Sequence, residues 1–324
     1  MTQMMHAAVL DKYGVIPRYG ELPVPKVADS DQVLLKMEAA SIKQLDKLKA
    51  SGKHYTRYDS FPAAVGVDGI GRLPDGQRVY AMGQGGMLAG YALAHRADCV
   101  PVPESLDAGV AALLPNALLG SDAALICRAN FQPGQSILIN GATGVSGRMA
   151  VQAARLRGAA RIVVTGRNQE SLDYLRTIGA DHCISLLDTP ESIIEQLVQV
   201  QQDHPLDIVL DYLWGEPVQW LLQAFARHCP KPVQLVTIGQ MAGVEISLPS
   251  GVLRSKPISI LGSGLGSINT EQLRAYNHEH LTQMLDKAAR GELVVDFRSF
   301  ILPEITEAWQ ASLKPGERAV VLID

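Results

Sequence analysis

Downstream of about residue 135, short apolar runs alternate with longer segments whose apolar residues recur every three or four positions. Such runs are typical of buried strands, and the longer repeat is typical of amphipathic helices. Strands are expected at Gln135–Asn140, Arg161–Thr165, His182–Ser185, Asp207–Asp211, Val233–Ile238 and Pro257–Leu261, and helices near 148–157, 168–178, 190–202 and 215–227. Strands separated by helices predict an α/β fold with a doubly wound parallel sheet.

The first part of the chain has a different pattern, in which short apolar runs are broken repeatedly by Pro and Gly. His6–Leu10 and Gln32–Met37 are expected to be strands, and the pattern as a whole predicts a compact β-rich unit. Beyond it, a capped helix is expected from Pro103 up to Pro115-Asn116, followed by a second apolar helix from about Ala117 to Cys127.

The last part of the chain is expected to add one helix, at about Thr270–Gly291, and two short strands, Arg298–Leu302 and Ala319–Ile323. Because the α/β region lies in the middle, we expect the C-terminal segment to return to the β-rich unit and complete it. The expected domains are therefore 1–116 with 266–324, and 117–265. The cleft between them is the default ligand site.

Composition narrows the class of protein. The chain has 324 residues and a net charge of −4, which gives no reason to expect nucleic acid or an acidic membrane as a partner. Its four cysteines are far apart and form no Cys-x-x-Cys pair, which suits reduced thiols and a cytoplasmic location. Neither a signal peptide nor an apolar run of the ~18 residues of a membrane span is expected.

Three glycines spaced by three interrupt the passage from the strand at 135–140 into the next helix. A strand, a glycine turn and a helix form the context of a dinucleotide fingerprint: the glycines let the backbone approach a pyrophosphate, and the helix N-terminus supplies free N–H groups. Cofactor contacts are therefore expected from Gly141, Thr143, Gly144, Val145, Ser146 and Gly147.

The next strand ends at Gly166-Arg167-Asn168. In NAD-binding units an acidic residue at this point binds the ribose 2′-hydroxyl, whereas here an arginine follows the glycine. A guanidinium can bind a 2′-phosphate through two hydrogen bonds. The sequence therefore predicts NADP(H) as cofactor, held here by Gly166, Arg167 and Asn168. The alternative is that Arg167 is a solvated residue at the start of a helix.

Two later strand ends offer further cofactor contacts. The fifth strand of the α/β region ends in Gly239-Gln240, and Ser263 follows the sixth. The carboxyl edge of such a sheet is where a nicotinamide would lie. The alternative at both places is an ordinary turn at the end of a strand.

Several segments, spread over nearly the whole chain, together resemble the medium-chain dehydrogenase/reductase superfamily, and within it the zinc-independent quinone oxidoreductase and enone reductase branch. The segments are His6–Leu10, Ser41–Asp46 with Ser51-Gly52, Pro62–Gly71, Leu114–Asn116, Gly141–Gly147, Leu302–Trp309 and Gly316–Val321. The resemblance implies a GroES-like β-rich domain, a Rossmann domain and hydride transfer from NADPH. It also implies a homodimer, formed in many members by edge-to-edge pairing of the sixth strands.

The resemblance bears on metal binding as well. Zinc members carry Gly-His-Glu where this chain has Gly66-Val67-Asp68, and a cysteine where it has the neighbourhood of Lys43. Zinc needs three or four N, S or O ligands. No zinc is therefore expected. Without a Lewis acid, alcohol oxidation is disfavoured relative to reduction of an electrophilic quinone or C=C bond.

Lys43 departs from the pattern of the quinone reductases, which have asparagine at this position. A cation here could bond a substrate carbonyl oxygen, stabilise a developing enolate and supply a proton. The alternative is a surface lysine on the same exposed turn as Lys47, Lys49 and Lys53.

Other substrate contacts are expected from Tyr55, or in its place Tyr58, since relatives often have a tyrosine pointing into the cleft here. Gly120 stands where many relatives have a threonine, so Asn116 or Ser121 could take over its hydrogen bond. Asp68 is expected to be structural, bonding turn amides.

The residues and the resemblance together predict an NADPH-dependent reductase that acts on a quinone or an α,β-unsaturated carbonyl without zinc. Two alternatives stay open: a non-catalytic NADPH-binding or RNA-binding relative, and an alcohol dehydrogenase. The expected partner is a small-molecule substrate, with no nucleic acid and no membrane.

Overall fold

The structure is a computed structural model that describes residues 2–54, 56–264 and 266–324. It divides into two compact units, 1–116 with 277–324 (unit 1) and 117–276 (unit 2). The first break falls after Asn116, and the chain returns to unit 1 at Asn277, whereas the sequence-based expectation puts the return at 265/266. Helix α8 (Thr270–Tyr276) stays with unit 2 because its Tyr276 donates a 2.8 Å hydrogen bond to the buried Asp122.

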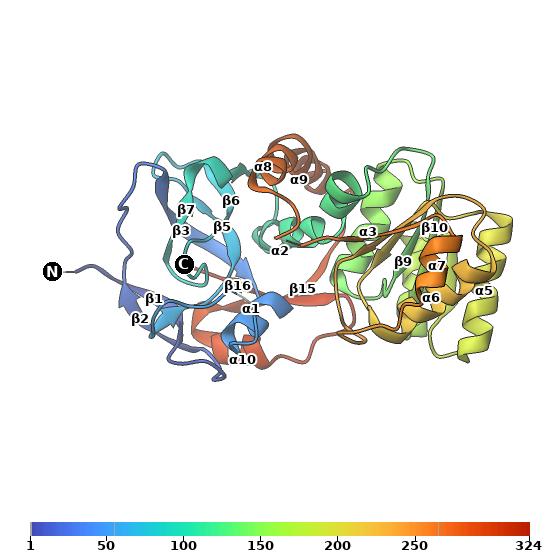
Figure 1. Ribbon diagram of the computed structural model, residues 1–324. Helices are drawn as coiled ribbons and strands as arrows, with labels where there is room; N and C mark the ends of the chain where they lie inside the picture. Colours follow the sequence, from blue (N-terminus) through green and yellow to red (C-terminus); the bar gives the residue numbers. More distant parts are fainter. Residues whose placement is uncertain (1, 55, 265) are drawn as a thin grey trace. The chain divides into compact units, whose positions relative to one another are not determined.

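Unit 2 is built on a six-stranded parallel sheet with the strand order β11-β10-β9-β12-β13-β14 (Figure 1). Its strands are β9 (Ser136–Asn140), β10 (Arg161–Gly166), β11 (His182–Ser185), β12 (Ile208–Asp211), β13 (Val233–Thr237) and β14 (Ile258–Gly262). Each observed end lies within one residue of the expected one. This is the strand order of doubly wound dinucleotide-binding folds, so the predicted fold class is confirmed.

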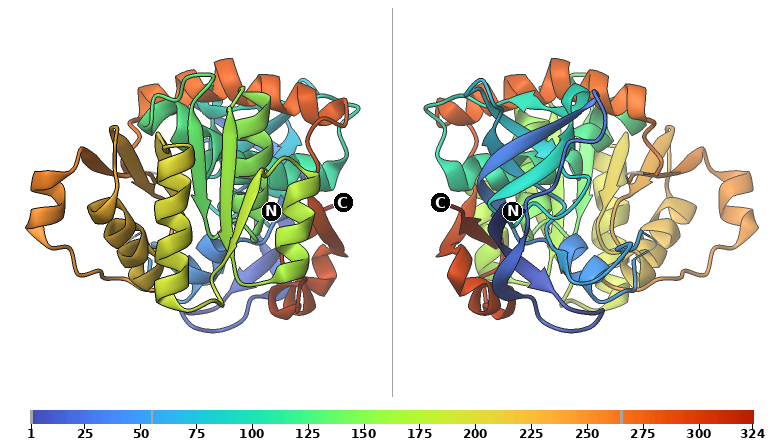
Figure 2. Two further views of the ribbon diagram at one scale, coloured as in Figure 1. Left: turned by 90° about the vertical axis from the view of Figure 1, so that its right-hand side faces the viewer. Right: turned by 90° about the vertical axis from the view of Figure 1, so that its left-hand side faces the viewer.

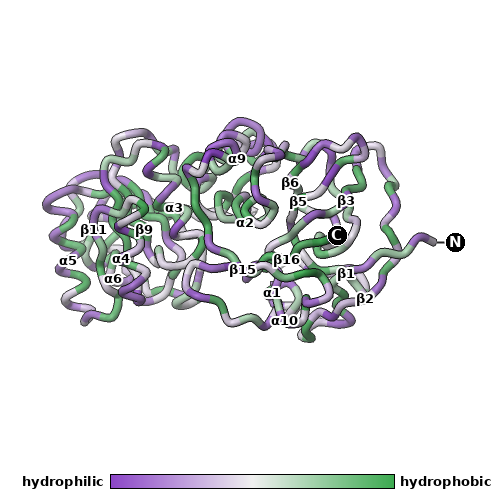
Figure 3. The backbone as a smooth tube through the Cα atoms, turned by 180° about the vertical axis from the view of Figure 1, so that it is seen from behind, coloured by the Kyte–Doolittle hydropathy of each residue, from purple (hydrophilic) through white to green (hydrophobic). Residues whose placement is uncertain are grey.

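Helices cover both faces of this sheet (Figure 2). One face is covered by α3 (Val145–Leu156) and α4 (Gln169–Thr177), and the other by α5 (Pro190–Asp203) and α6 (Gly215–Arg227). Strand β9 serves both cores, because Ile137 and Ile139 point to the α3 side and Leu138 to the α5 side. Burial on both faces explains why β9 and β12 are almost entirely apolar; Figure 3 colours the chain by hydropathy.

Unit 1 contains two β-sheets, of three and seven strands. The strands are β1 (Met4–Leu10), β2 (Arg18–Pro23), β3 (Gln32–Ser41), β4 (Ala63–Ala64), β5 (Asp68–Arg72), β6 (Arg78–Met82), β7 (Tyr91–His95), β8 (Val100–Pro101), β15 (Asp296–Ile301) and β16 (Glu317–Leu322). The C-terminal β16 pairs antiparallel with β3, and β15 pairs parallel with β16. The C-terminal segment thus completes the N-terminal β-rich unit, as the sequence predicts.

Helix α2 (Ala108–Leu119) differs from the expectation, because it runs through Pro115 instead of ending there. Proline inside a helix loses one hydrogen bond and costs roughly 3 kcal/mol. The side chains on either side, including Leu113, Leu114 and Leu118, are completely buried, and their packing outweighs this cost. The wider helical stretch Ala108–Arg128 is long and apolar enough to cross a membrane, but 67% of its most apolar window is buried in the protein, as in a core helix.

The remaining helical elements are short. The helix expected at Thr270–Gly291 is divided into α8, a π-helical turn (Asn277–Leu281) and α9 (Thr282–Ala289). The others are α1 (Gln44–Ala50), α7 (Ser250–Ser255), α10 (Ile305–Gln310), a second π-helical turn (Ala124–Arg128) and 3₁₀ turns at Arg96–Asp98 and Leu302–Glu304.

Candidate functional site

The glycine turn lies between β9 and α3, and each of its three glycines has its own physical reason. Gly141 has φ +83°, and a Cβ there would lie 2.7 Å from the side chain of Leu213. A Cβ at Gly147 would lie 2.5 Å from the backbone of Ala142. Gly144 is different, since a Cβ there would meet no heavy atom within 4 Å. A tight turn, an open backbone and close packing of the helix are the three roles that a dinucleotide fingerprint requires.

Helix α3 begins at Val145, and Ser146 follows in its first turn. Gly144 stands at the N-cap position and has no side chain to accept a hydrogen bond from the first N–H groups. These groups and the positive end of the helix dipole suit a pyrophosphate approaching over Gly144. The residues present therefore fit a dinucleotide.

The glycine turn is fixed to the neighbouring strand β10. Ala142 N–H donates to the carbonyl of Thr165 at 2.9 Å, and Gly141 N–H donates to the Thr165 hydroxyl oxygen at 3.0 Å. The methyl group of Thr143 lies so close to Gly166 that a Cβ there would be 2.4 Å from it. Gly166 is thus required by contact with Thr143.

A buried polar chain connects three adjacent strands at the same edge of the sheet. The Thr165 hydroxyl donates to Asn140 Oδ1 at 2.6 Å, and Asn140 Nδ2 donates to Asp211 Oδ1 at 2.8 Å. Burial raises the pKa of Asp211, although the hydrogen bond from Asn140 and two backbone N–H groups oppose the shift. The chain couples the glycine turn to the turn that follows β12.

The end of β10 carries the predicted 2′-phosphate site. Arg167 is exposed, and Asn168 forms the N-cap of α4 by accepting a 2.7 Å hydrogen bond from Ser171 N–H. Asn168 Oδ1 therefore orders the helix start. Arg167 lies immediately before it, at the edge of the sheet.

A hollow of about 260 Å³ lies where β12 and β13 end. Its lining residues are Trp214, Thr237, Ile238, Gly239, Gln240 and Val244. Gly239 and Gln240 thus line a hollow, while their contact with a cofactor stays a prediction, and the other four lining residues were not predicted from the sequence. Ser263 follows β14, is buried, and donates its N–H to Thr237 O at 2.8 Å, so it supports the same edge.

Trp214 is the most unusual residue of the hollow. Its backbone has φ +55° and ψ −159°, a conformation that costs a bulky residue roughly 1–3 kcal/mol. Asp211 holds this turn, because its carboxylate accepts the N–H groups of Leu213 at 3.1 Å and of Trp214 at 3.0 Å. The only sequence signal was its place between a strand end and a helix start.

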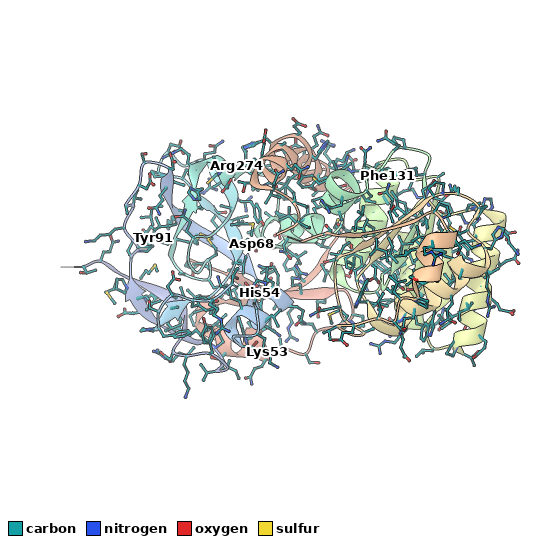
Figure 4. The ribbon with its side chains drawn as sticks, in the orientation of Figure 1. Lys53, His54, Asp68, Tyr91, Phe131 and Arg274 are labelled. Atoms are coloured by element: carbon teal, nitrogen blue, oxygen red, sulfur yellow. The ribbon has the colours of Figure 1, made fainter. Side chains whose placement is uncertain are left out.

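In unit 1, Lys43 is buried and not on an exposed turn, so the surface-lysine alternative is wrong. Its residue is 3% exposed, and its ammonium contacts Asp68 Oδ1, lies 3.4 Å from Asp46 Oδ2 and donates to Ser41 O at 2.6 Å. Asp68, labelled in Figure 4, also accepts a 2.7 Å hydrogen bond from Tyr80. The described partners of Lys43 are therefore protein oxygens, and they compete with a substrate for the hydrogens of the ammonium group.

Asp46, and not Asp68, bonds the turn amides. It accepts the N–H groups of Lys43 at 2.7 Å and Val67 at 2.8 Å. Burial raises the pKa of Asp46, and the charge of Lys43 offsets part of this shift. Arg318 adds a second cation: burial lowers its pKa, while Asp68 and Asp46 oppose that shift. The cluster pairs two buried carboxylates with two cations.

Among the other expected substrate contacts, Asn116 is half-buried and accepts a 3.2 Å hydrogen bond from Arg318 Nη1. Ser121 is completely buried, and its hydroxyl hydrogen is donated to Ala117 O at 2.6 Å, so its role toward a substrate stays a prediction. Tyr58 packs against the core of unit 1 beside Phe61. Tyr55 lies outside the described residues, so its role stays a prediction.

Metal ligands are sparse in the part of the chain that the structure describes. No three His, Cys, Asp or Glu side chains are grouped there so that they could hold a metal ion. Val67 offers no ligand atom, and the nearby Lys43 presents an ammonium group, which cannot ligate zinc while protonated.

Comparison with known proteins agrees with this geometry. The zinc-binding dehydrogenase family matches residues 146–283. The chain is 27% identical to a probable NADPH-dependent quinone reductase of Emericella nidulans, over 98% of this chain and 100% of that protein. It is 31% identical to an NADPH-dependent alkenal/one oxidoreductase of Arabidopsis thaliana, over 56% of this chain and 52% of that protein.

A solved structure extends the similarity to the fold. The quinone oxidoreductase of Thermus thermophilus superposes with a TM-score of 0.76 at 27% identity, covering 98% of this chain and 100% of that one. The strand order, the glycine turn and these relatives agree. They indicate a quinone oxidoreductase-like protein of the medium-chain dehydrogenase/reductase family, and they support an oxidoreductase function.

Proposed function

We propose that the protein transfers a hydride from NADPH to a quinone or to an α,β-unsaturated carbonyl, without zinc. The observation that carries the proposal is the pairing of a fingerprint turn open at Gly144 with Arg167 at the end of β10. The names of the Emericella and Arabidopsis relatives support the same cofactor and the same kinds of acceptor.

NADPH would supply the hydride when bound. Its pyrophosphate would lie over Gly144 at the start of α3, with contacts from Thr143, Val145 and Ser146, and Arg167 would pair with the 2′-phosphate. The backbone at Gly239, Gln240 and Ser263 would bond the carboxamide and so fix the position of the ring. Gly141, Gly147 and Gly166 have no side chain, and this lets Leu213, Ala142 and Thr143, respectively, pack closely against them at this edge of the sheet.

Polar side chains would bind the acceptor. Tyr55 and Asn116 are the proposed donors to its oxygen. We propose Lys43 as a positioning residue, because its ammonium neutralises Asp46 and Asp68 and thereby holds the turn after β3 against the start of β5. Proximity and orientation would provide most of the rate acceleration.

The proposal that the protein works without zinc rests on the side chains at the positions of the zinc ligands. The positions that carry ligands in zinc relatives have Val67 and Lys43 here, and an apolar side chain and an ammonium cannot bind the ion. Reduction of an electrophilic acceptor does not need a Lewis acid in the way that alcohol oxidation does. The family description that includes zinc matches residues 146–283, which do not include Lys43 or Val67.

The test is NADPH oxidation measured with a panel of quinones and enones, together with Arg167→Ala. We expect the variant to lose about tenfold to a hundredfold in kcat/KM for NADPH, because one or two charge-assisted hydrogen bonds are removed, and to keep its kcat/KM for NADH. Arg176→Ala, which changes another exposed arginine of unit 2, is the control. An unchanged NADPH preference in Arg167→Ala would refute the 2′-phosphate assignment, and zinc bound stoichiometrically and required for turnover would refute zinc independence.

We also propose a cytoplasmic location and a homodimer. All four cysteines are free thiols, as a reducing compartment favours. The edge strand β14 has β13 as its partner in the described sheet. On its other side Arg128 Nε donates to Gly262 O at 2.7 Å, and the backbone groups that precede Gly262 are the ones proposed to pair with a second copy.

A further inference from the structure

Trp214 shows a local conflict that the proposed cofactor contacts do not explain. A tryptophan adopts φ +55° at the N-cap of α6, where Ser, Thr, Asp or Asn would be favourable and its own side chain makes no capping hydrogen bond. Strain of this kind persists only where the surroundings hold it, and it is concentrated at functional sites. A functional role of the Trp214 indole would account for this strain.

The surroundings do hold the turn, from two sides. On one side the buried Asp211 carboxylate accepts the N–H of Trp214. On the other, the segment after β13 bonds back to it: Ala242 N–H donates to Leu213 O at 2.8 Å, and a Cβ at Gly215 would lie 2.7 Å from Ala242 O. The two turns are therefore bonded to each other, and the backbone of Trp214 is held from both sides.

Trp214 lies between the core of unit 2 and the hollow. The residue is half-buried, packs against the apolar core on the α6 side and also lines the hollow of about 260 Å³. It is the aromatic member of that lining, beside Ile238 and the backbone of Gly239. A hollow of this size suits a single ring better than a drug-sized ligand.

We propose that Trp214 is a ring-binding residue, whose indole stacks on a flat, electron-poor six-membered ring held in this hollow. The indole face is electron-rich, and it attracts electron-poor or cationic rings. Oxidised nicotinamide and a quinone both offer such a ring, so the inference rests on the proposed function and adds a residue that selects for a planar π-acceptor.

The test uses fluorescence, because stacking on such a ring quenches indole emission. The chain has three tryptophans, Trp214, Trp220 and Trp309. Trp220→Phe with Trp309→Phe leaves Trp214 as the only emitter, and Trp214→Phe with Trp309→Phe leaves the neighbouring Trp220 as the matched control. Each protein is titrated with NADP⁺, with adenosine 2′,5′-bisphosphate, which carries the 2′-phosphate but no nicotinamide, and with duroquinone.

We expect NADP⁺ or duroquinone to quench Trp214 by more than half and Trp220 much less, while adenosine 2′,5′-bisphosphate leaves Trp214 emission nearly unchanged. Quenching by NADP⁺ alone identifies the ring as nicotinamide, and quenching by duroquinone alone identifies it as the acceptor. By calorimetry, Trp214→Ala should weaken binding of the quenching ligand about threefold to tenfold and leave the Kd of adenosine 2′,5′-bisphosphate unchanged.

Three results would overturn the inference: equal quenching by the bisphosphate, equal quenching of Trp220, or equal weakening of both nucleotides in Trp214→Ala. Each would mean that the residue supports the turn without touching a ring. If calorimetry detects no binding of either nucleotide, the proposed function fails, and duroquinone alone then decides the role of Trp214: selective quenching supports it and no quenching rejects it.

Discussion

At the scale of single residues, the cluster around Lys43 shows how a buried cation is accommodated. The ammonium contacts carboxylates from the first turn of α1 and from the start of β5, and it also bonds the backbone of Ser41. Removing one member of such a group costs more than the group itself contributes, because the remaining charges stay buried without compensation.

We therefore predict that Lys43→Met lowers the free energy of unfolding by about 3–5 kcal/mol, measured by urea denaturation. Burial raises the pKa of Asp46 and the charge of Lys43 opposes that shift, so without the ammonium the pKa of Asp46 in the folded variant would rise further above that of the unfolded chain. The folded state would then bind more protons, so the loss should shrink as pH falls from roughly 8 to 5.

Two controls separate this effect from a general loss of packing. Lys53→Met changes an exposed lysine and should stay within about 0.5 kcal/mol of the wild type. Lys43→Met combined with Asp68→Asn should recover part of the loss, because the second change removes one of the unpaired charges. A loss that does not depend on pH would contradict the electrostatic explanation.

The burial of Lys43 and its ion pairs could not be predicted from the sequence. Spacing placed it beside other lysines on a turn, which favours a solvated side chain. Its partner Asp68 belongs to β5, and Tyr80, which bonds Asp68, belongs to β6; only the pairing of β5 with β3 and with β6 brings these residues together. Apolar periodicity carries no information about such pairings.

At the scale of elements, the strand–turn–helix unit at 136–156 was predictable because each signal is local. Periodicity gives the strand and helix, and the glycines give the turn. The full length of helix α2 was not predictable from local signals, because burial of its apolar side chains outweighs the local effect of Pro115. The strained turn at Trp214 was also missed, because it is held by hydrogen bonds that its N–H groups donate to the Asp211 carboxylate, and these depend on the folded sheet edge.

The glycine turn offers a matched pair of substitutions. We predict that Gly144→Ala stays within about 0.5 kcal/mol of wild-type stability, because its Cβ meets no heavy atom within 4 Å, yet weakens NADPH binding at least tenfold. Gly147→Ala should instead lose about 1–3 kcal/mol, because its Cβ would lie 2.5 Å from the Ala142 backbone.

Thermal unfolding and NADPH titration of the two variants provide the measurement. If Gly144→Ala binds NADPH like the wild type, the pyrophosphate does not pass over this glycine. If Gly147→Ala is as stable as the wild type, the third glycine is not required for close packing.

At the scale of the whole molecule, the order of the two units along the chain was predictable, since a β-rich pattern precedes the alternating one. The return of the chain to unit 1 was harder to place. The Tyr276–Asp122 hydrogen bond keeps α8 in unit 2, and these residues are 154 positions apart.

The edge of the unit 2 sheet gives a prediction about assembly. Ser263 N–H bonds to β13, so strand alternation directs the N–H groups of Ile260 and Gly262 to the open side of β14. We expect sedimentation to give twice the 34.9 kDa chain mass, and Gly262→Pro, which removes one of these donors and no side chain, to shift the population toward monomer. A wild-type monomer, or a variant that stays fully dimeric, would contradict pairing through this edge.

The central claim is that hydride passes from NADPH to an electrophilic acceptor. The most direct measurement uses NADPH that carries deuterium at both positions of the nicotinamide C4, with an α,β-unsaturated carbonyl as acceptor, and locates the label in the product by mass spectrometry and NMR. We predict one deuterium per product molecule at the β-carbon, with the proton at the α-carbon taken from solvent. Product without deuterium at the β-carbon, or no consumption of NADPH with any enone or quinone, would contradict the account.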